Sequence, residues 1–248
     1  MLANPDHITI IARGALLEMS RRKDLAILGM FMGIFLLLIA ISRVVGLENP
    51  ATGTFLLNLS LTLIVGLSHL VTLTMAARQL PDELERRTLY PLMARPIRRA
   101  DILTGKWSAC LLTGLLTFIT LTLLAILLVP RMEPYAFGTL LQLILLQVPA
   151  LALTAALGIA FSIFFPRLLG LFLAATLVFG AGQLLRFSGS LPLLHLLPDP
   201  GRLNLVLRYT DGIAPLGLAD FLIAFVYASL WAGVLLTAAC QRFERRSI

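Results

Sequence analysis

The sequence predicts an all-α polytopic membrane protein with six transmembrane helices. Of its 248 residues, 58% are hydrophobic and 13% are charged, whereas charged residues make up roughly a quarter of an average soluble domain. The charges are also segregated, because six stretches of 18 to 33 residues contain none. These stretches are 25–42, 49–77, 107–130, 134–166, 168–185 and 221–241. Uncharged apolar runs of about 18 residues or more are typical of membrane-spanning helices, so a soluble enzyme, a disordered chain and a disulfide scaffold are excluded.

These runs define the expected organisation of one transmembrane domain over residues 1–248. The six helices are expected at 25–45, 54–76, 107–129, 137–164, 168–186 and 217–240. An amphipathic helix within residues 1–24 is expected to lie in the membrane interface, because its apolar residues recur at three- and four-residue intervals. Residues 77–106 then form a loop. Residues 187–216 form an external or re-entrant segment, because the apolar piece at 191–198 is too short to span.

The basic residues predict how the chain lies in the membrane. Six spans put both termini and the 77–106 loop on one side, which then carries 15 of the 20 Lys and Arg residues, against 5 on the other side. The positive-inside rule places the richer side in the cytoplasm. Basic loops beside anionic lipid account for most of the net charge of +7, so no nucleic-acid partner is expected.

Motifs for catalysis are absent from the sequence. It contains no GxxxxGK[ST] phosphate loop, no HExxH and no GxSxG, so the chain itself is predicted not to be an enzyme and to bind no cofactor or metal. Among the polar side chains within the expected spans, His69, Gln142 and Gln147 are the candidates for a functional or packing role. Such residues line a pathway or join helices by hydrogen bonds, and both interpretations stay open.

The most informative segment is the 77–106 loop. Pro81 suits the first turn of a helix, and the acids that follow it suit the positive end of the helix dipole. Leu84, Thr88, Leu89 and Leu92 can then share one face, and Pro96 ends the helix. An ordinary basic loop on lipid headgroups would not need this apolar face.

The same loop resembles the signature of ABC-2 type transporter permeases. The resemblance is carried by Glu83-x-Glu85-x-x-Thr88, Leu92, Arg95-Pro96-Ile97-x-Arg99, Ile102 and Gly105-Lys106. The tail is similar to the subgroup that contains the nitrous-oxide-reductase maturation and gliding-motility permeases. That similarity is carried by Leu197-Pro198, Arg202-x-Asn204, Gly212 and Arg242-Phe243-x-Arg245-Arg246. Two positions depart from the family pattern, Arg87 and Pro91.

The resemblance implies a permease subunit of the bacterial plasma (inner) membrane, most plausibly of an exporter. It implies that a second copy or a homologous permease completes the pathway, and that a separate cytoplasmic ATPase binds ATP and Mg²⁺. A coupling helix between spans two and three would rest on this ATPase. The residues implied in coupling are Glu83, Leu84, Glu85, Thr88, Leu89, Leu92, Pro96, Arg99 and Lys106. Two alternatives remain, a stand-alone secondary carrier and a non-transporting scaffold driven by an ATPase, and the substrate is not readable.

Overall fold

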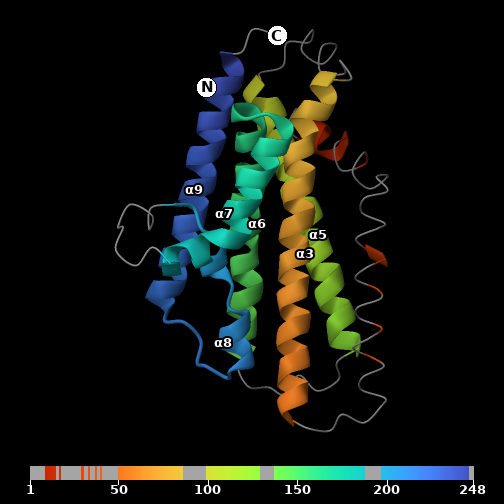
Figure 1. Cartoon of the computed structure of the whole chain (residues 1–248), viewed down its shortest axis with the longest axis vertical. Coiled ribbons are helices and arrows are strands. Elements are labelled where there is room, and N and C mark those ends of the chain that lie inside the picture. The colour runs from red at the N-terminus through yellow and green to blue at the C-terminus, as the bar shows by residue number, and fades with distance from the viewer. Residues whose placement is uncertain are drawn as a thin grey trace.

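The computed structural model describes residues 9–14, 17, 29–30, 33, 37, 40, 50–85, 99–128, 137–187 and 197–245. Helices account for all the regular structure within these residues (Figure 1). The elements are α3 (Pro50–Glu85), α5 (Arg99–Leu128), α6 (Phe137–Phe164), α7 (Arg167–Phe187), the short 3₁₀ helix η2 (Pro200–Leu203), α8 (Val206–Thr210) and α9 (Leu218–Glu244).

Four of the described helices are long and apolar enough to cross a membrane. Their candidate spans are Thr54–Pro81, Ala100–Ala125, Phe137–Phe164 and Leu218–Glu244. The apolar part of α7 that is described, Arg167–Ala181, is shorter. The expected first span at 25–45 and the interfacial helix lie largely outside the described residues, so the count of six stays a prediction.

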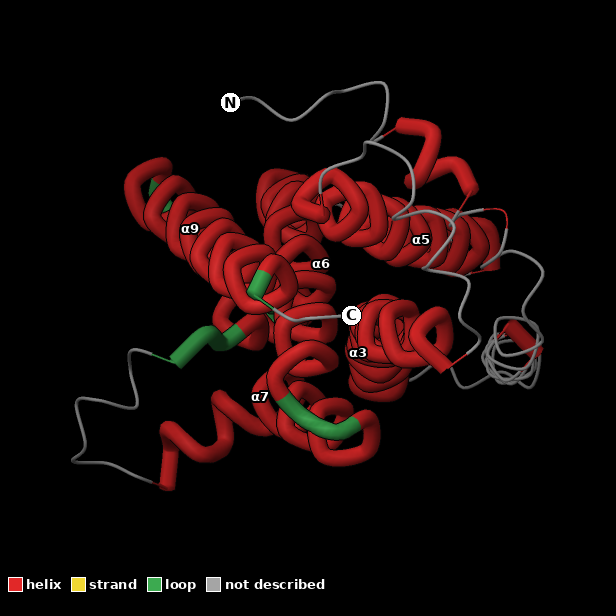
Figure 2. Tube along the Cα trace, turned by 90° about the horizontal axis from the view of Figure 1, so that it is seen from above, coloured by secondary structure: helices red, strands yellow, loops and turns green. Residues whose placement is uncertain are grey.

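Helix α6 is the centre of the bundle. It contacts α3, α5, α7 and α9, and Figure 2 shows these helices arranged around it. In the most apolar 18-residue stretch of α6, 83% of the residues are buried, whereas the corresponding share in α9 is 11%. All residues from Pro149 to Ala160 are buried. The helix continues through Pro149, which cannot donate a hydrogen bond to the carbonyl of Leu145. Its continuity therefore depends on packing by the surrounding helices.

Small residues allow the central helices to approach closely. A Cβ atom added to Gly158 of α6 would lie 2.6 Å from the Cβ of Ala76 and 3.3 Å from the backbone N of Ala77, both on α3. A Cβ added to Gly114 of α5 would overlap the hydroxyl of Thr72. In lipid, helix association depends on such close packing, because lipid chains are as apolar as the helices.

Helices α6 and α7 form an antiparallel pair around a very short turn. Only residues 165 and 166 separate them, and the N–H of Gly170 donates to the carbonyl of Pro166 at 2.8 Å. A Cβ on Gly170 would lie 2.7 Å from the carbonyl oxygen of Phe161. The missing side chain therefore lets the first turn of α7 rest directly on the end of α6.

Helix α9 has two chemically different faces. Its buried residues are Ala228, Ala232, Ala239 and Phe243, so three of the four are small. Its exposed face carries large aliphatic side chains, among them Leu222, Ile223, Val226, Leu230 and Val234. A helix of a soluble protein buries its large aliphatic side chains, whereas α9 exposes them. This arrangement is typical of a helix surrounded by lipid.

Helices α3 and α5 both extend into the expected 77–106 loop. Helix α3 continues through Pro81 to Glu85, and α5 already begins at Arg99. The sequence prediction ended each helix at its first charge. In the structure, Leu80 on α3 and Ile102 and Leu103 on α5 are at most 1% exposed. Their burial extends the helix pair beyond the uncharged runs, and only residues 86–98 remain between the two helices.

The contact at Gly158 predicts a large difference between two glycine substitutions. We expect Gly158→Val to push α6 away from the α3 backbone, at a cost of about 1–3 kcal/mol for overpacking. Its melting temperature in detergent should fall clearly. Gly233→Val on α9 is the matched control, since a Cβ there meets no atom within 4 Å. Equal melting temperatures for the two variants would contradict this packing.

Candidate functional site

The predicted coupling segment begins and ends on the packed pair α3 and α5. Glu83, Leu84 and Glu85 form the end of α3, and Arg99 is the first residue of α5. Thr88, Leu89, Leu92 and Pro96 lie outside the described residues. The predicted coupling helix therefore stays a prediction, but the two helices that would carry its motion are defined.

Three polar side chains near this end of the helix pair are buried. Lys106 and Asp101 of α5 are each 2% exposed, and Gln79 of α3 is 8% exposed. Because Thr72 lies opposite Gly114 in an antiparallel pair, Gln79 is at the level of residue 107. Lys106 was expected among the coupling residues; its side chain is buried in this structure, and its role in coupling stays a prediction.

His69 joins the two central helices. Its Nδ1 lies 2.7 Å from the Thr154 hydroxyl, and this hydroxyl donates to the carbonyl of Ala150 at 2.9 Å. The hydroxyl proton is therefore engaged, so Nδ1 carries the proton in the His69–Thr154 bond and Nε2 is left as an acceptor. This arrangement supports the helix-joining interpretation of His69, because the ring is buried at 6% exposure.

Gln147 is a fully buried polar residue near this bond. It is 0% exposed, and its amide lies close enough to interact with the His69 ring. Neither amide atom has a hydrogen bond of good geometry to a residue that the structure describes. Gln147 is thus a helix-core residue, and a polar group of this kind needs a partner in such an apolar setting.

Gln142 fastens the 197–216 segment to α6. The Gln142 amide donates to the Leu216 carbonyl at 2.9 Å, and its oxygen accepts from the Leu216 N–H at 2.7 Å. One turn earlier, the Thr139 hydroxyl donates to the carbonyl of Ile213 at 3.2 Å. A side chain predicted to line a pathway or join helices therefore satisfies backbone groups just before α9 begins.

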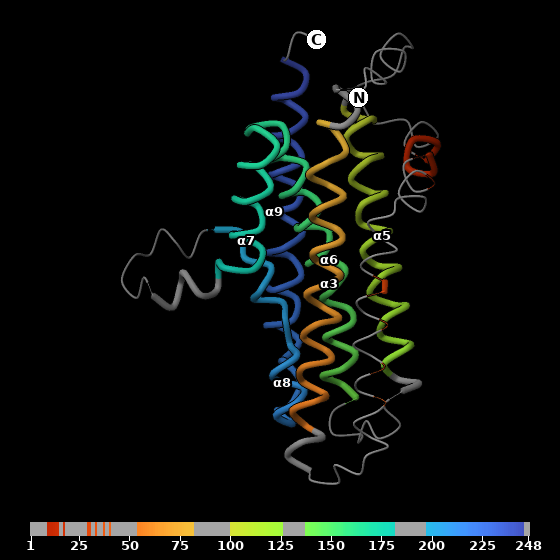
Figure 3. Tube along the Cα trace, turned by 45° about the vertical axis from the view of Figure 1, so that its right-hand side comes forward, coloured from red at the N-terminus to blue at the C-terminus, as the bar shows by residue number. Residues whose placement is uncertain are grey.

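Tyr227 of α9 holds the beginning of the same segment. Its hydroxyl donates to the Leu197 carbonyl at 2.7 Å and accepts from the Asp199 N–H at 3.2 Å. The Arg202 guanidinium lies 5.7 Å from the centre of the Tyr227 ring, within cation–π range. Residues 197–203 contact α6, α7 and α9, and they lie between the two ends of the bundle rather than beyond either (Figure 3). This position is that of a segment folded back into the bundle.

Asp199 is held by its own loop. The Asp199 Oδ1 atom accepts from the Gly201 N–H at 2.8 Å, and Oδ2 lies 3.7 Å from the Arg202 Nε. Burial raises the pKa of the Asp199 carboxyl, and the Gly201 N–H and the Arg202 charge act in the opposite direction. The loop thus supplies the partners that a buried carboxylate needs.

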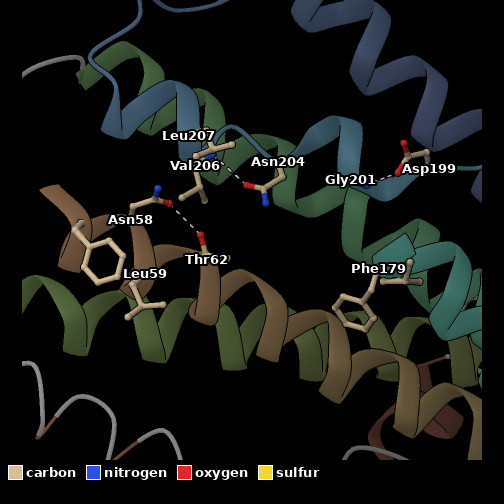
Figure 4. A pocket seen from close by; sticks show the side chains of 11 residues that line it. Asn58, Leu59, Thr62, Phe179, Asp199, Gly201, Asn204, Val206 and Leu207 are labelled. Carbon is tan, nitrogen blue, oxygen red and sulfur yellow. Dashed lines mark hydrogen bonds between the residues drawn. The ribbon is translucent and has the colours of Figure 1, made fainter. Parts of the chain in front are cut away.

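A pocket of about 570 Å³ lies where this segment faces α3 and α7. Figure 4 shows Asn58 and Thr62 on one side and Asn204 and Asp199 on the other. Asn58 was not among the predicted site residues, and Asn204 was named only as part of the tail resemblance. They are 146 positions apart, and no motif spacing could have joined them.

Metal chemistry has no visible basis in the described part of the chain. Among those residues, no group of three His, Cys, Asp or Glu side chains is placed to hold a metal ion. Cys110 and Cys240 are not joined by a disulfide.

Comparison with protein families identifies one match over most of the chain. The model of a family described as "ABC-2 family transporter protein" matches residues 15–186. No curated protein matches the chain closely enough to count as a relative. The matched range covers α3, α5 and α6 and ends within α7, so the tail resemblance is not included in it.

The two bonds of Gln142 predict a defined loss of stability. We expect Gln142→Met, which keeps a similar volume, to leave two backbone groups of Leu216 without partners and to lower the unfolding free energy by about 1–3 kcal/mol. Unfolding in mixed detergent measures this. Gln241→Met, at an exposed position of α9, should have almost no effect. A Gln142 variant as stable as the parent would show that the bonds do not hold the segment.

Proposed function

The chain belongs to the ABC-2 family of transporters, and on that premise we propose that it is the permease subunit of an exporter driven by a separate cytoplasmic ATPase. It is a multi-pass membrane protein of the transport machinery. We propose that two permeases, identical or homologous, form the pathway, and that ATP and Mg²⁺ bind only to the partner. The proposed location is the bacterial plasma (inner) membrane, with both termini cytoplasmic.

The length of α3 is the main observation that supports a permease driven by a separate ATPase. This helix has 36 residues, which corresponds to about 54 Å, while the hydrocarbon core of a bilayer is about 30 Å thick. Its polar end, with Glu83 and Glu85, therefore extends beyond the core. A protein docked on the adjoining loop would act directly on α3 and α5.

The absence of a phosphate loop from the sequence supports the same arrangement. A chain that moves cargo against a gradient needs an energy source, and a partner with a nucleotide site supplies one. A stand-alone secondary carrier is less well supported, since the acids of the described spans, Asp101, Asp220 and Glu244, lie only at helix ends and none lies near a centre. The tail resemblance favours, within this proposal, the subgroup of the maturation and gliding-motility permeases.

Docking at the loop predicts the behaviour of a double variant. We expect Leu84→Asp, Leu89→Asp to reach the membrane at the parental level but to lose the ATPase on co-purification, because an unpaired charge buried at the contact costs about 3–5 kcal/mol. Transport should be lost with it. The control is Gln241→Asp, which adds a charge at an exposed position at the same end of the bundle. If the double variant retains the ATPase as tightly as the control, this loop is not the docking site.

Orientation is tested by single cysteines. In a background with Cys110 and Cys240 replaced by alanine, we expect Arg95→Cys to be labelled by an impermeant thiol reagent only from the cytoplasmic face. Asp211→Cys, at an exposed position just after α8, should be labelled only from the opposite face, as the 15-to-5 distribution of basic residues requires. Labelling of both positions from one face would overturn the proposed topology.

A further inference from the structure

The pocket beside α3 combines an apolar wall with two hydrogen-bond donors. Its wall includes Phe55 and Leu59 of α3, Phe179 of α7 and Leu207 of α8. Its volume of about 570 Å³ lies within the roughly 300–1,000 Å³ of small-molecule sites. Figure 4 shows the pocket extended along α3, with Leu59 towards one end and Phe179 towards the other.

The apolar wall is open towards the outside of the bundle. Phe55 is 63% exposed, Phe179 is 50% exposed and Leu207 is 59% exposed. Phe55 lies within the span Thr54–Pro81. Large apolar side chains exposed around a pocket mouth in a spanning region favour entry of an apolar group from the bilayer rather than from water.

The two donors come from the amide groups of Asn58 and Asn204. The Asn58 Oδ1 accepts from the Thr62 hydroxyl at 3.1 Å, and the Asn204 Oδ1 accepts from the Val206 N–H at 3.0 Å. Each amide oxygen is thereby fixed, so each NH₂ group is turned into the space between α3 and the 204–207 stretch (Figure 4). Both can donate to an oxygen atom placed between them.

The charge around the pocket selects against an anion. Among the described residues that line the pocket, Asp199 is the only acid, and its carboxylate is already paired with Arg202 at 3.7 Å. None of these described lining residues is basic. A ligand with an uncharged, oxygen-bearing group is therefore better matched than a phosphate or a carboxylate.

We propose that this pocket binds an uncharged amphiphile from the bilayer, with its acyl chain along the apolar wall and its ester or hydroxyl oxygen on Asn58 and Asn204. Such a ligand would also be the class of cargo that the permease moves, and its role as cargo rests on the proposed function. Binding itself requires neither the ATPase nor ATP.

The test uses a monoacylglycerol with a diazirine on its acyl chain, added to vesicles containing the purified full-length chain. After irradiation, labelled peptides are mapped by mass spectrometry. We expect label to concentrate on peptides that contain Phe55 to Thr62 and Gly201 to Leu207. Uniform label that is equally strong on the exposed face of α9 would show surface lipid only and would overturn the proposal.

Two variants make the test specific. Asn58→Asp with Asn204→Asp keeps both acceptor oxygens, for Thr62 and for the Val206 N–H, and removes both donors, so pocket label should fall about tenfold. Leu59→Trp fills the pocket without adding charge and should lower the label similarly. Gln241→Glu makes the same change from amide to acid outside the pocket and should have no effect. Unchanged label in both pocket variants, with parental melting temperatures, contradicts the site.

Two further outcomes separate this inference from the proposed function. The Leu84→Asp, Leu89→Asp variant should keep full pocket label although it loses the ATPase, since the loop lies far from the pocket along α3. In the parent with its ATPase bound, ATP should lower the label. Label that is insensitive to ATP would refute the role as cargo. Cross-linking of Phe55→Cys mainly to a second copy of the chain would show that another permease covers the pocket, which also overturns the proposal.

Discussion

Close approach of neighbouring helices at Gly158 and Gly114 is the constraint on which the rest of the bundle depends. Water cannot fill a gap between helices in hydrocarbon, and lipid chains do not drive helices together. Contact between the helices must therefore depend on surfaces that fit closely together. Helix α6 is buried on nearly all sides from Pro149 to Ala160 because Ala76 and Ala77 meet Gly158 without a side chain between them. The positions of α3, α5, α7 and α9 follow from their contacts with this one helix.

Polar side chains fix the positions of segments that are not held by close contact at small residues. The Trp107 indole donates to the carbonyl of Ala152 at 2.9 Å, His69 bonds to Thr154, and Gln142 holds Leu216. Each bond joins segments that are distant in the sequence, and each uses a group that hydrocarbon would leave unsatisfied. The same requirement gives the 197–216 segment its place, since its backbone groups bond to α6 and α9 within the bundle.

The sequence predicted the helical membrane fold and the family correctly, because charge segregation and a local motif are both visible along the chain. The fourth span was expected at 137–164, where α6 lies. Helices α3 and α5 extend further into the expected 77–106 loop than the positions of the charges indicated. Asp101 and Lys106 carry charges, yet each is only 2% exposed. Their burial depends on residues that are neighbours in space and not in the sequence. The pocket could not be predicted, since Asn58 and Asn204 meet only through folding. The coupling residues from Thr88 to Pro96 stay predictions.

Helix α3 carries features of interest at both of its ends. Asn58 lines the pocket within its first ten residues, and Glu83 to Glu85 form its last turn. A rod of about 54 Å converts rotation into displacement. If it tilts by about 5° around its midpoint, each end moves by about 2 Å, and the two ends move in opposite directions. That distance is comparable with the length of a hydrogen bond, so a small leverage at one membrane surface is enough to open or close contacts at the other.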